Sequence, residues 1–248
     1  MQGSYRRVAC AGLALALPCV SLAVVARMDT SAAAATPIVR TVMVPTVRFG
    51  DNFEHKRFSG WTTVRTGVGG RAFIQRRVVK GGKYAAQLSA TTTKGSYAYA
   101  RKQLSPGQQN VIASGDFRLT NEGAQQSNVP LFRLFNAAGA RMISVYRQNH
   151  FHDQVWIQYN GVYHPTRGKF PLNIWAHLEV HVAPAGSGES TIEVRLNKVP
   201  IYNIPMVRVG NTDVRVVQIG DEARRQGFTI FADNIDIHAF RRVTLKIH

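Results

Sequence analysis

Thr191-Ile192-Glu193-Val194-Arg195-Leu196-Asn197 places an apolar residue at every second position. The same alternation recurs in residues 177–182 and 215–219, and helical periodicity is almost absent from the chain. Strict alternation is typical of half-buried antiparallel strands. Asn160-Gly161 separates two such segments, and this dipeptide is a strong signal for a two-residue hairpin. We therefore predict an all-β fold, a two-sheet antiparallel jelly-roll sandwich.

The start of the chain has the layout of a secretory signal. Arg6 and Arg7 precede an apolar stretch, and no acidic residue occurs before Asp29. We predict a signal peptide at 1–26 with cleavage as late as 35, a linker at 27–47, one domain at 48–240 and a basic tail at 241–248, which is either an appended edge strand or a loose tail. An uncleaved leader would instead anchor the chain in a membrane, because its apolar stretch approaches the roughly 18 to 20 residues that span a bilayer. We expect a secreted or cell-envelope-associated monomer.

The net charge limits the classes of partner that we expect, and the cysteine content limits the covalent links. The chain has 31 Lys and Arg residues against 14 Asp and Glu residues, which gives a net charge of +17. Such a surface attracts polyanions, although a basic surface also serves solubility alone. Export argues against nucleic acid as the physiological partner and leaves acidic polysaccharides, teichoic-type polymers and lipid headgroups. Cys10 and Cys19 lie in the leader, so the mature domain forms no disulfide.

Two acidic clusters lie near the ends of the predicted domain. The first is Phe49-Gly-Asp-Asn-Phe-Glu54, and the second is Phe231-Ala-Asp-Asn-Ile-Asp-Ile237. In a regular strand Asp233 shares parity with Phe231, Ile235 and Ile237, which places its carboxylate on or beside the apolar face. A buried carboxylate needs a partner. We expect the two clusters to mark the first and last strands and to lie together.

The order of these and other motifs resembles that of the concanavalin A-like, laminin-G-like jelly-roll domains of exported bacterial proteins, over residues 48–240. The motifs are Asp51–Glu54, Gly60-Trp61, Gly81–Ala86, Tyr97–Tyr99, Trp175–Glu179, Val194–Asn197, Gln218–Gly220 and Ala232–Ile235. The resemblance implies a structural calcium ion that joins the first and last strands, with Asp51, Glu54 and Asp233 as ligands, since calcium prefers oxygen ligands. A hydrogen-bonded carboxylate without metal is the alternative.

Domains of this fold include carbohydrate-binding modules, adhesive domains and polysaccharide-cleaving enzymes, so fold alone does not decide activity. Aromatic, basic and hydrogen-bonding residues gather in the middle of the chain, and we expect them to share one sugar-binding face, although each tryptophan taken alone is more typical of packing. These candidate ligand-binding residues are Arg133, Arg147, Trp156, Gln158, His177, Glu179 and His181. The sequence favours an exported, non-catalytic carbohydrate-binding module for an acidic polysaccharide or cell-envelope glycan.

An enzyme is the alternative interpretation, specifically a polysaccharide lyase that cleaves a uronic acid polymer by β-elimination. A lyase needs groups that neutralise the uronate carboxylate and groups that transfer protons; Arg133, Tyr146, Gln158 and His177 are the candidates. The arginine-rich strand and the Gln-Ile-His element of alginate-lyase-type jelly rolls are absent, which ranks the lyase second and leaves no catalytic residue assigned. The paired carboxylates of jelly-roll glucanases, Glu-x-Asp-x-x-Glu, are absent too. A structural or adhesive surface protein is the third interpretation.

Overall fold

The computed structural model describes residues 38–123, 128–149, 153–186, 188–209, 213–222 and 226–247, so the predicted signal peptide lies outside the described residues. Val39–Ile247 form one compact unit, and within the described ranges there are fifteen strands and no helix. No helix in these ranges is long and apolar enough to cross a membrane. The strands are β1 (Ile38–Asp51), β2 (Thr63–Thr66), β3 (Arg71–Gln75), β4 (Ala85–Ala90), β5 (Ala98–Gln108), β6 (Asn110–Glu122), β7 (Asn128–Phe135), β8 (Arg141–Gln148), β9 (Gln154–Tyr159), β10 (Val162–Lys169), β11 (Ala176–Gly186), β12 (Glu189–Leu196), β13 (Val199–Val207), β14 (Val214–Asp221) and β15 (Phe228–Ile247).

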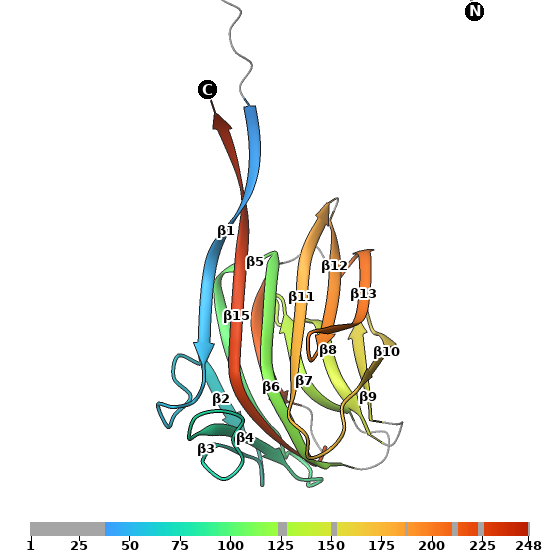
Figure 1. Ribbon diagram of the computed structural model, residues 1–248. Coiled ribbons are helices and arrows are strands. Elements are labelled where there is room, and N and C mark those ends of the chain that lie inside the picture. The colour runs from blue at the N-terminus through green and yellow to red at the C-terminus, as the bar shows by residue number, and fades with distance from the viewer. Residues whose placement is uncertain are drawn as a thin grey trace, which may run out of the picture. The chain divides into compact units, whose positions relative to one another are not determined.

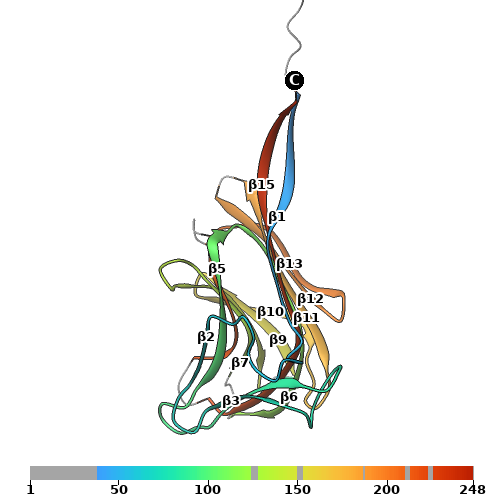
Figure 2. The same ribbon diagram turned by 90° about the vertical axis from the view of Figure 1, so that its left-hand side faces the viewer.

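The strands form two antiparallel sheets that face each other (Figure 2). Sheet A has the order β13-β12-β11-β6-β15-β4-β3, with β1 paired to β15, and sheet B has the order β10-β9-β8-β7-β14-β5-β2. The predicted hairpin is present, because Tyr159 and Val162 pair on either side of Asn160-Gly161. The prediction of an all-β, two-sheet antiparallel sandwich is confirmed.

The core lies between the inner faces of the two sheets. Phe117 of β6 and Phe132 of β7 meet edge to face across it, with ring centroids 5.0 Å apart. Leu178 of sheet A and Ile157 of sheet B are completely buried in the same cluster. Burial of this kind stabilises a fold by about 25 cal/mol per Å² of apolar surface. The outer faces of both sheets are therefore left for polar side chains.

Two segments differ from the boundaries that the sequence suggested. Residues 38–47, expected to belong to a linker, form the first part of β1. The basic tail continues β15 as a strand through residue 247, which is the edge-strand form of the two that the sequence allowed, although it is not a separate strand. The outer parts of these two strands run side by side beyond the rest of the sandwich in both views (Figures 1 and 2). Each segment supplies the other with a hydrogen-bonding edge, and for this reason both are strands.

A β-bulge in β15 corrects the parity argument for Asp233. Between Asp233, which pairs with Asp116, and Asp236, which pairs with Ser114, β15 contains one extra residue. Asn234 has a positive φ of 48° there. Because a bulge shifts the alternation by one residue, Asp233 lies on the outer side with Phe231, while Ile235 and Ile237 point into the core. The four residues do not share one face.

Candidate functional site

A polar row crosses the outer face of sheet B. Gln158, Ser144, Arg133, Gln218 and Arg101 pair in register on the adjacent strands β9, β8, β7, β14 and β5. Each has a sequence neighbour in the core, so the row points away from it. Arg133, Ser144 and Gln218 are nevertheless buried, because the side chains on this face cover one another. A buried polar row must satisfy its own hydrogen bonds.

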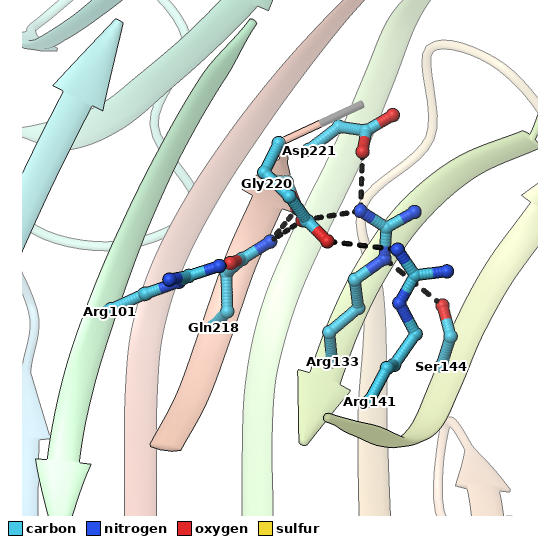
Figure 3. A network of polar contacts seen from close by, with 8 residues as sticks. Arg101, Arg133, Arg141, Ser144, Gln218, Gly220 and Asp221 are labelled. Carbon is cyan, nitrogen blue, oxygen red and sulfur yellow. Dashed lines mark hydrogen bonds and ion pairs between the residues drawn. The ribbon is translucent and has the colours of Figure 1, made fainter. Parts of the chain in front are cut away.

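The centre of the row surrounds a carboxylate. Glu222 follows the last residue of β14, and its Oε2 accepts hydrogen bonds from Arg133 Nη1 and Gln218 Nε2, each at 2.5 Å. Its Oε1 accepts one from Arg141 Nη2 at 2.9 Å. Burial opposes ionisation, but the charge of Arg133 and the hydrogen bonds to the carboxylate, from Gln218 and Arg133 among others, together outweigh it and lower the pKa of Glu222 to about 2. We call Arg133, Arg141 and Gln218 the carboxylate cradle (Figure 3).

Arg101 fixes the orientation of the cradle's amide. Its guanidinium lies 4.6 Å from the ring centroid of Tyr99 and 4.8 Å from that of Phe135, so two aromatic faces hold it. Its Nε donates a 2.7 Å hydrogen bond to Gln218 Oε1. The amide nitrogen of Gln218 is therefore turned toward Glu222. Figure 3 shows Arg101 and Gln218 at one side of this network.

A second carboxylate anchors the cradle from within. Asp221 is completely buried and accepts a hydrogen bond from Arg133 Nη1. Ser144 accepts a further hydrogen bond from Arg133 Nε at 3.3 Å. Asp221 and Glu222 share Nη1 of Arg133, so Asp221 continues to hold the guanidinium when Glu222 is replaced.

A pair of tyrosines lies beside this network. Tyr146 of β8 and Tyr163 of β10 meet edge to face with ring centroids 6.0 Å apart. Tyr146 is 2% exposed, and its hydroxyl has no hydrogen-bond partner among the described residues. Burial, and secondarily Tyr163, raises the pKa of Tyr146, so its hydroxyl stays protonated. Such a group can donate a proton or a hydrogen bond.

Trp156 and Gln158 extend the face toward the β9–β10 hairpin. Trp156 pairs with Tyr146, and its indole Nε1 also lacks a partner among the described residues. Gln158 lines a depression of about 140 Å³ together with Arg141 and Asn160. The side chains of Gln158, Arg141 and Asn160 give this depression polar groups that can contact the hydroxyl groups of a ligand.

The structure brings together only part of the set of residues expected from the sequence. Arg133, Tyr146, Trp156 and Gln158 share the outer face of sheet B. His177, Glu179 and His181 lie on β11 of sheet A, on its outer face, because Leu178 and Val180 between them belong to the core. Of the seven candidate ligand-binding residues, three lie on this face and three on the opposite outer face of the sandwich. The single face expected for Trp156, Gln158, His177, Glu179 and His181 is therefore wrong.

Arg147 is the seventh residue of that set, and it is separate from both groups. It points to the inner side of β8, where its side chain is 1% exposed. It donates to Phe170 O at 2.7 Å and to Asn149 Oδ1 at 2.8 Å, and it forms ion pairs with Glu122 and Asp153. The contacts of Arg147 are those of a structural residue.

The predicted calcium ligands do not form one centre. Asp51 is buried and accepts hydrogen bonds from Phe53 N and Trp61 Nε1, each at 2.8 Å. Glu54 and Asp233 accept hydrogen bonds from backbone N–H groups of the loop between β3 and β4. The described residues contain no group of three or more His, Cys, Asp or Glu side chains that could hold a metal ion. All three carboxylates accept hydrogen bonds from N–H groups. This arrangement fits hydrogen-bonded carboxylates and does not fit a calcium ion held by the three of them.

Sequence reasoning missed Arg141, Tyr163 and Glu222, and used Gln218 only as part of a motif. One signal was present: Gln218 interrupts the apolar strand Val214–Asp221 at an outward position. The others carry no periodic signal, because Glu222 lies just beyond a strand and Arg141 begins one. Only the strand order of sheet B, in which β14 separates β7 from β5, brings them together.

Comparison with known protein families and with curated proteins found no match. Solved structures do match. An endo-β-1,4-glucuronan lyase from the fungus Trichoderma reesei is 13% identical, with a TM-score of 0.62 over 77% of this chain and 94% of that one. The carbohydrate esterase vb_24B_21 from Shiga toxin-encoding bacteriophage phi24B is 15% identical, with a TM-score of 0.56 over 80% and 99% of the two chains. A double mutant of alginate lyase Aly36B, in complex with an alginate trisaccharide, is 11% identical, with a TM-score of 0.52 over 78% and 98% of the two chains. The likeness shows that this chain shares the jelly-roll-type β-sandwich of these proteins.

Proposed function

We propose that the protein is a polysaccharide lyase that cleaves a uronic acid polymer at the outer face of sheet B. In β-elimination a base removes the proton on the carbon next to the carboxylate, and the electron pair forms a carbon–carbon double bond. The bond to the glycosidic oxygen breaks, and that oxygen takes up a proton. The protein has to neutralise the carboxylate, which makes the proton acidic, and to provide proton-transfer groups.

The observation that carries this proposal is the carboxylate cradle. Arg133, Arg141 and Gln218 hold a carboxylate through three hydrogen bonds in the structure itself. Planar guanidinium groups are well suited to bind carboxylates, and they remain charged at any physiological pH. The same three groups would bind and neutralise the carboxylate of a uronate residue.

The tyrosine pair is placed for proton transfer. Tyr146 lies two residues along β8 from Ser144, a contact of Arg133, which is a separation of about 7 Å along the strand. Its protonated hydroxyl suits the donation of a proton to the leaving oxygen. Tyr163 is 51% exposed on the open side of the pair and is accessible to a polymer. We assign the proton transfers to these two hydroxyls.

Two further observations support a uronic acid polymer as the substrate. The fold is shared with a glucuronan lyase and with alginate lyase Aly36B. The chain has a net charge of +17, which favours association with a polyanion. We further propose that the protein is exported, as the leader sequence indicates, and therefore meets its substrate outside the cell or in the cell envelope.

The test is incubation with glucuronan, alginate and other uronic acid polymers, followed by the ultraviolet absorbance of the unsaturated product. We expect turnover by the wild type and a loss of about 10²- to 10⁴-fold in Tyr146→Phe, because a proton-transfer group contributes about that factor. Glu189→Gln, a change far from the cradle, is the matched control and should leave the rate unchanged. Loss of activity in His177→Gln but not in Tyr146→Phe would place the active site on sheet A and overturn the assignment.

A non-catalytic carbohydrate-binding module is the second candidate, and one observation favours it. The described part of the polar row contains no histidine, and Arg133 is already paired with Asp221 and Glu222. In that case polymers bind without any unsaturated product, and affinity falls steeply with salt if charge carries it. Lack of retention on any glycan at low salt would leave the structural or adhesive interpretation.

A further inference from the structure

We propose that Glu222 occupies, in the free protein, the place of the substrate's carboxylate, and that a uronate residue binds by displacing it. The cradle would then be a carboxylate subsite blocked by the protein's own side chain. The inference rests on the proposed function for the class of ligand. It does not depend on catalysis, because it concerns binding alone.

The geometry around Glu222 is that of a bound ligand. Both of its carboxylate oxygens are engaged, by Arg133 and Gln218 on one oxygen and by Arg141 on the other. The donors come from β7, β8 and β14, so three neighbouring strands converge on a single group. A uronate carboxylate has the same charge and the same two acceptor oxygens. It can replace Glu222 and keep every hydrogen bond.

The two carboxylates at Arg133 differ in how easily they can leave. The side chain of Asp221 is completely buried, whereas that of Glu222 is 23% exposed. Asp221 is also the last residue of β14 and pairs with Ala98 of β5, while Glu222 lies beyond the strand. Release of Glu222 therefore returns a charge to water and breaks no sheet hydrogen bond. Asp221 remains as the anchor that positions Arg133.

The charge balance favours the exchange. Arg133 and Arg141 face two carboxylates in the present arrangement, and withdrawal of Glu222 leaves, among the described residues, Asp221 alone against these two guanidinium groups. An excess of positive charge in a partly dry site attracts another anion. Gln218 stays oriented by Arg101 in either state, so the subsite is already formed when the ligand arrives, and preorganisation of this kind increases affinity.

Two other roles for Glu222 lead to different expectations. A general base has to accept a proton near neutral pH, and a carboxylate whose pKa is held at about 2 is poorly matched to that task. A purely structural residue would hold Arg133 and Arg141 in place, so its removal would weaken ligand binding. Self-occlusion makes the opposite prediction, because removal of Glu222 frees the cradle.

The experiment is calorimetric titration of the full chain with a glucuronate oligosaccharide, with its carboxyl-reduced neutral analogue as the control ligand. Under the proposal, Glu222→Ala and Glu222→Gln bind the glucuronate oligosaccharide about tenfold more tightly than the wild type, because the occluded fraction no longer competes. Affinity for the neutral analogue stays unchanged. Arg141→Gln shifts the affinity in the opposite direction, and Glu189→Gln leaves it at the wild-type value.

Tighter binding by both Glu222 variants, together with weaker binding by Arg141→Gln, would support the displacement. Equal or weaker binding by the Glu222 variants, or binding by no variant at all, would overturn it. Circular dichroism and cooperative unfolding show whether each variant is folded, and Glu222→Gln keeps the size of the side chain if Glu222→Ala does not fold. Failure of the proposed function gives a different result, since uronates then bind without forming an unsaturated product.

Discussion

Glu54 and Asp233, which lie near opposite ends of the folded chain, hold the same loop. Glu54 Oε1 accepts hydrogen bonds from Lys83 N at 2.8 Å and Tyr84 N at 3.0 Å. Asp233 Oδ2 accepts hydrogen bonds from Lys80 N at 3.0 Å and Gly81 N at 3.1 Å. Between these two sites the backbone passes so close to Glu54 that a Cβ on Gly82 would lie 2.3 Å from its carboxylate. The loop between β3 and β4 is the part that connects the two carboxylates.

We expect Asp233→Asn to lower the free energy of unfolding by about 1–3 kcal/mol, since an amide group cannot accept from all the N–H groups that surround it. Glu54→Gln should cost less, because its bond to Lys83 N is exposed. Urea titration measures both, with Glu189→Gln as a control that stays within about 0.5 kcal/mol of the wild type. Equal stability of Asp233→Asn and the wild type would show that the loop is not held in this way.

The same arrangement bears on the calcium that the sequence led us to expect. Since N–H donors surround Glu54 and Asp233, and Asp51 bonds with Trp61, we expect the melting temperature to be the same in calcium and in chelator. Differential scanning calorimetry with and without EGTA checks this. An increase in melting temperature with calcium that disappears in Glu54→Gln would contradict the hydrogen-bonded arrangement and restore the metal.

The fold was more accessible from sequence than the site, because alternation and turns are local signals. The hairpin at Asn160-Gly161 and the strand around Glu193 were predicted from neighbouring residues, and the structure contains both. The error at Asp233 arose from one inserted residue, since a bulge at Asn234 reverses the face of everything that follows. The alternating pattern of the sequence does not indicate where a bulge inserts its extra residue.

The site depends on strand order, which the sequence does not encode locally. Tyr146 and Gln158 were candidates that lie on the outer face of sheet B, yet His177 has the same outward parity on a strand of the other sheet. Parity separates the inner from the outer side of a strand, but it does not tell which of two sheets contains that strand. Only the pairing of β7 with β14 joined Arg133 to Gln218.

The His177–Asp116 pair on sheet A predicts a pH-dependent contribution to stability. The hydrogen bond that His177 Nδ1 donates to Asp116 Oδ1, at 3.1 Å, raises the pKa of His177. Burial opposes it, but hydrogen bonds from His177 and Asn234 lower the pKa of Asp116. The histidine contribution is complete below its unfolded pKa of about 6.5 and is lost as the pH rises through the raised value. The aspartate contribution is present above about 3.9 and is lost as the pH falls through the lowered value.

We therefore expect the difference in unfolding free energy between the wild type and His177→Gln to be largest near pH 5 and to shrink above about pH 7. Because the His177 side chain is 37% exposed, solvent screening keeps the difference below about 1 kcal/mol. Urea titrations at several pH values measure it. A difference that is constant across this range would mean that the pair does not change its protonation on folding.

Arg147 gives the clearest separation between a structural and a ligand-binding role. Its guanidinium lies inside the sandwich and donates hydrogen bonds to Glu122, Asp153, Asn149 and the carbonyl of Phe170. Arg147→Met removes the donors and leaves two carboxylates without a countercharge. We expect a loss of about 3 kcal/mol, at the lower end for a broken buried pair, because Glu122 and Asp153 are partly exposed to water. Arg147→Lys should recover only part of this loss, since an ammonium group cannot reproduce the planar fork of a guanidinium.

Urea denaturation measures both variants, and uronate titration of the folded fraction provides the second readout. A ligand-binding role would produce the reverse pattern, in which Arg147→Lys weakens uronate binding while the free energy of unfolding stays at the wild-type value.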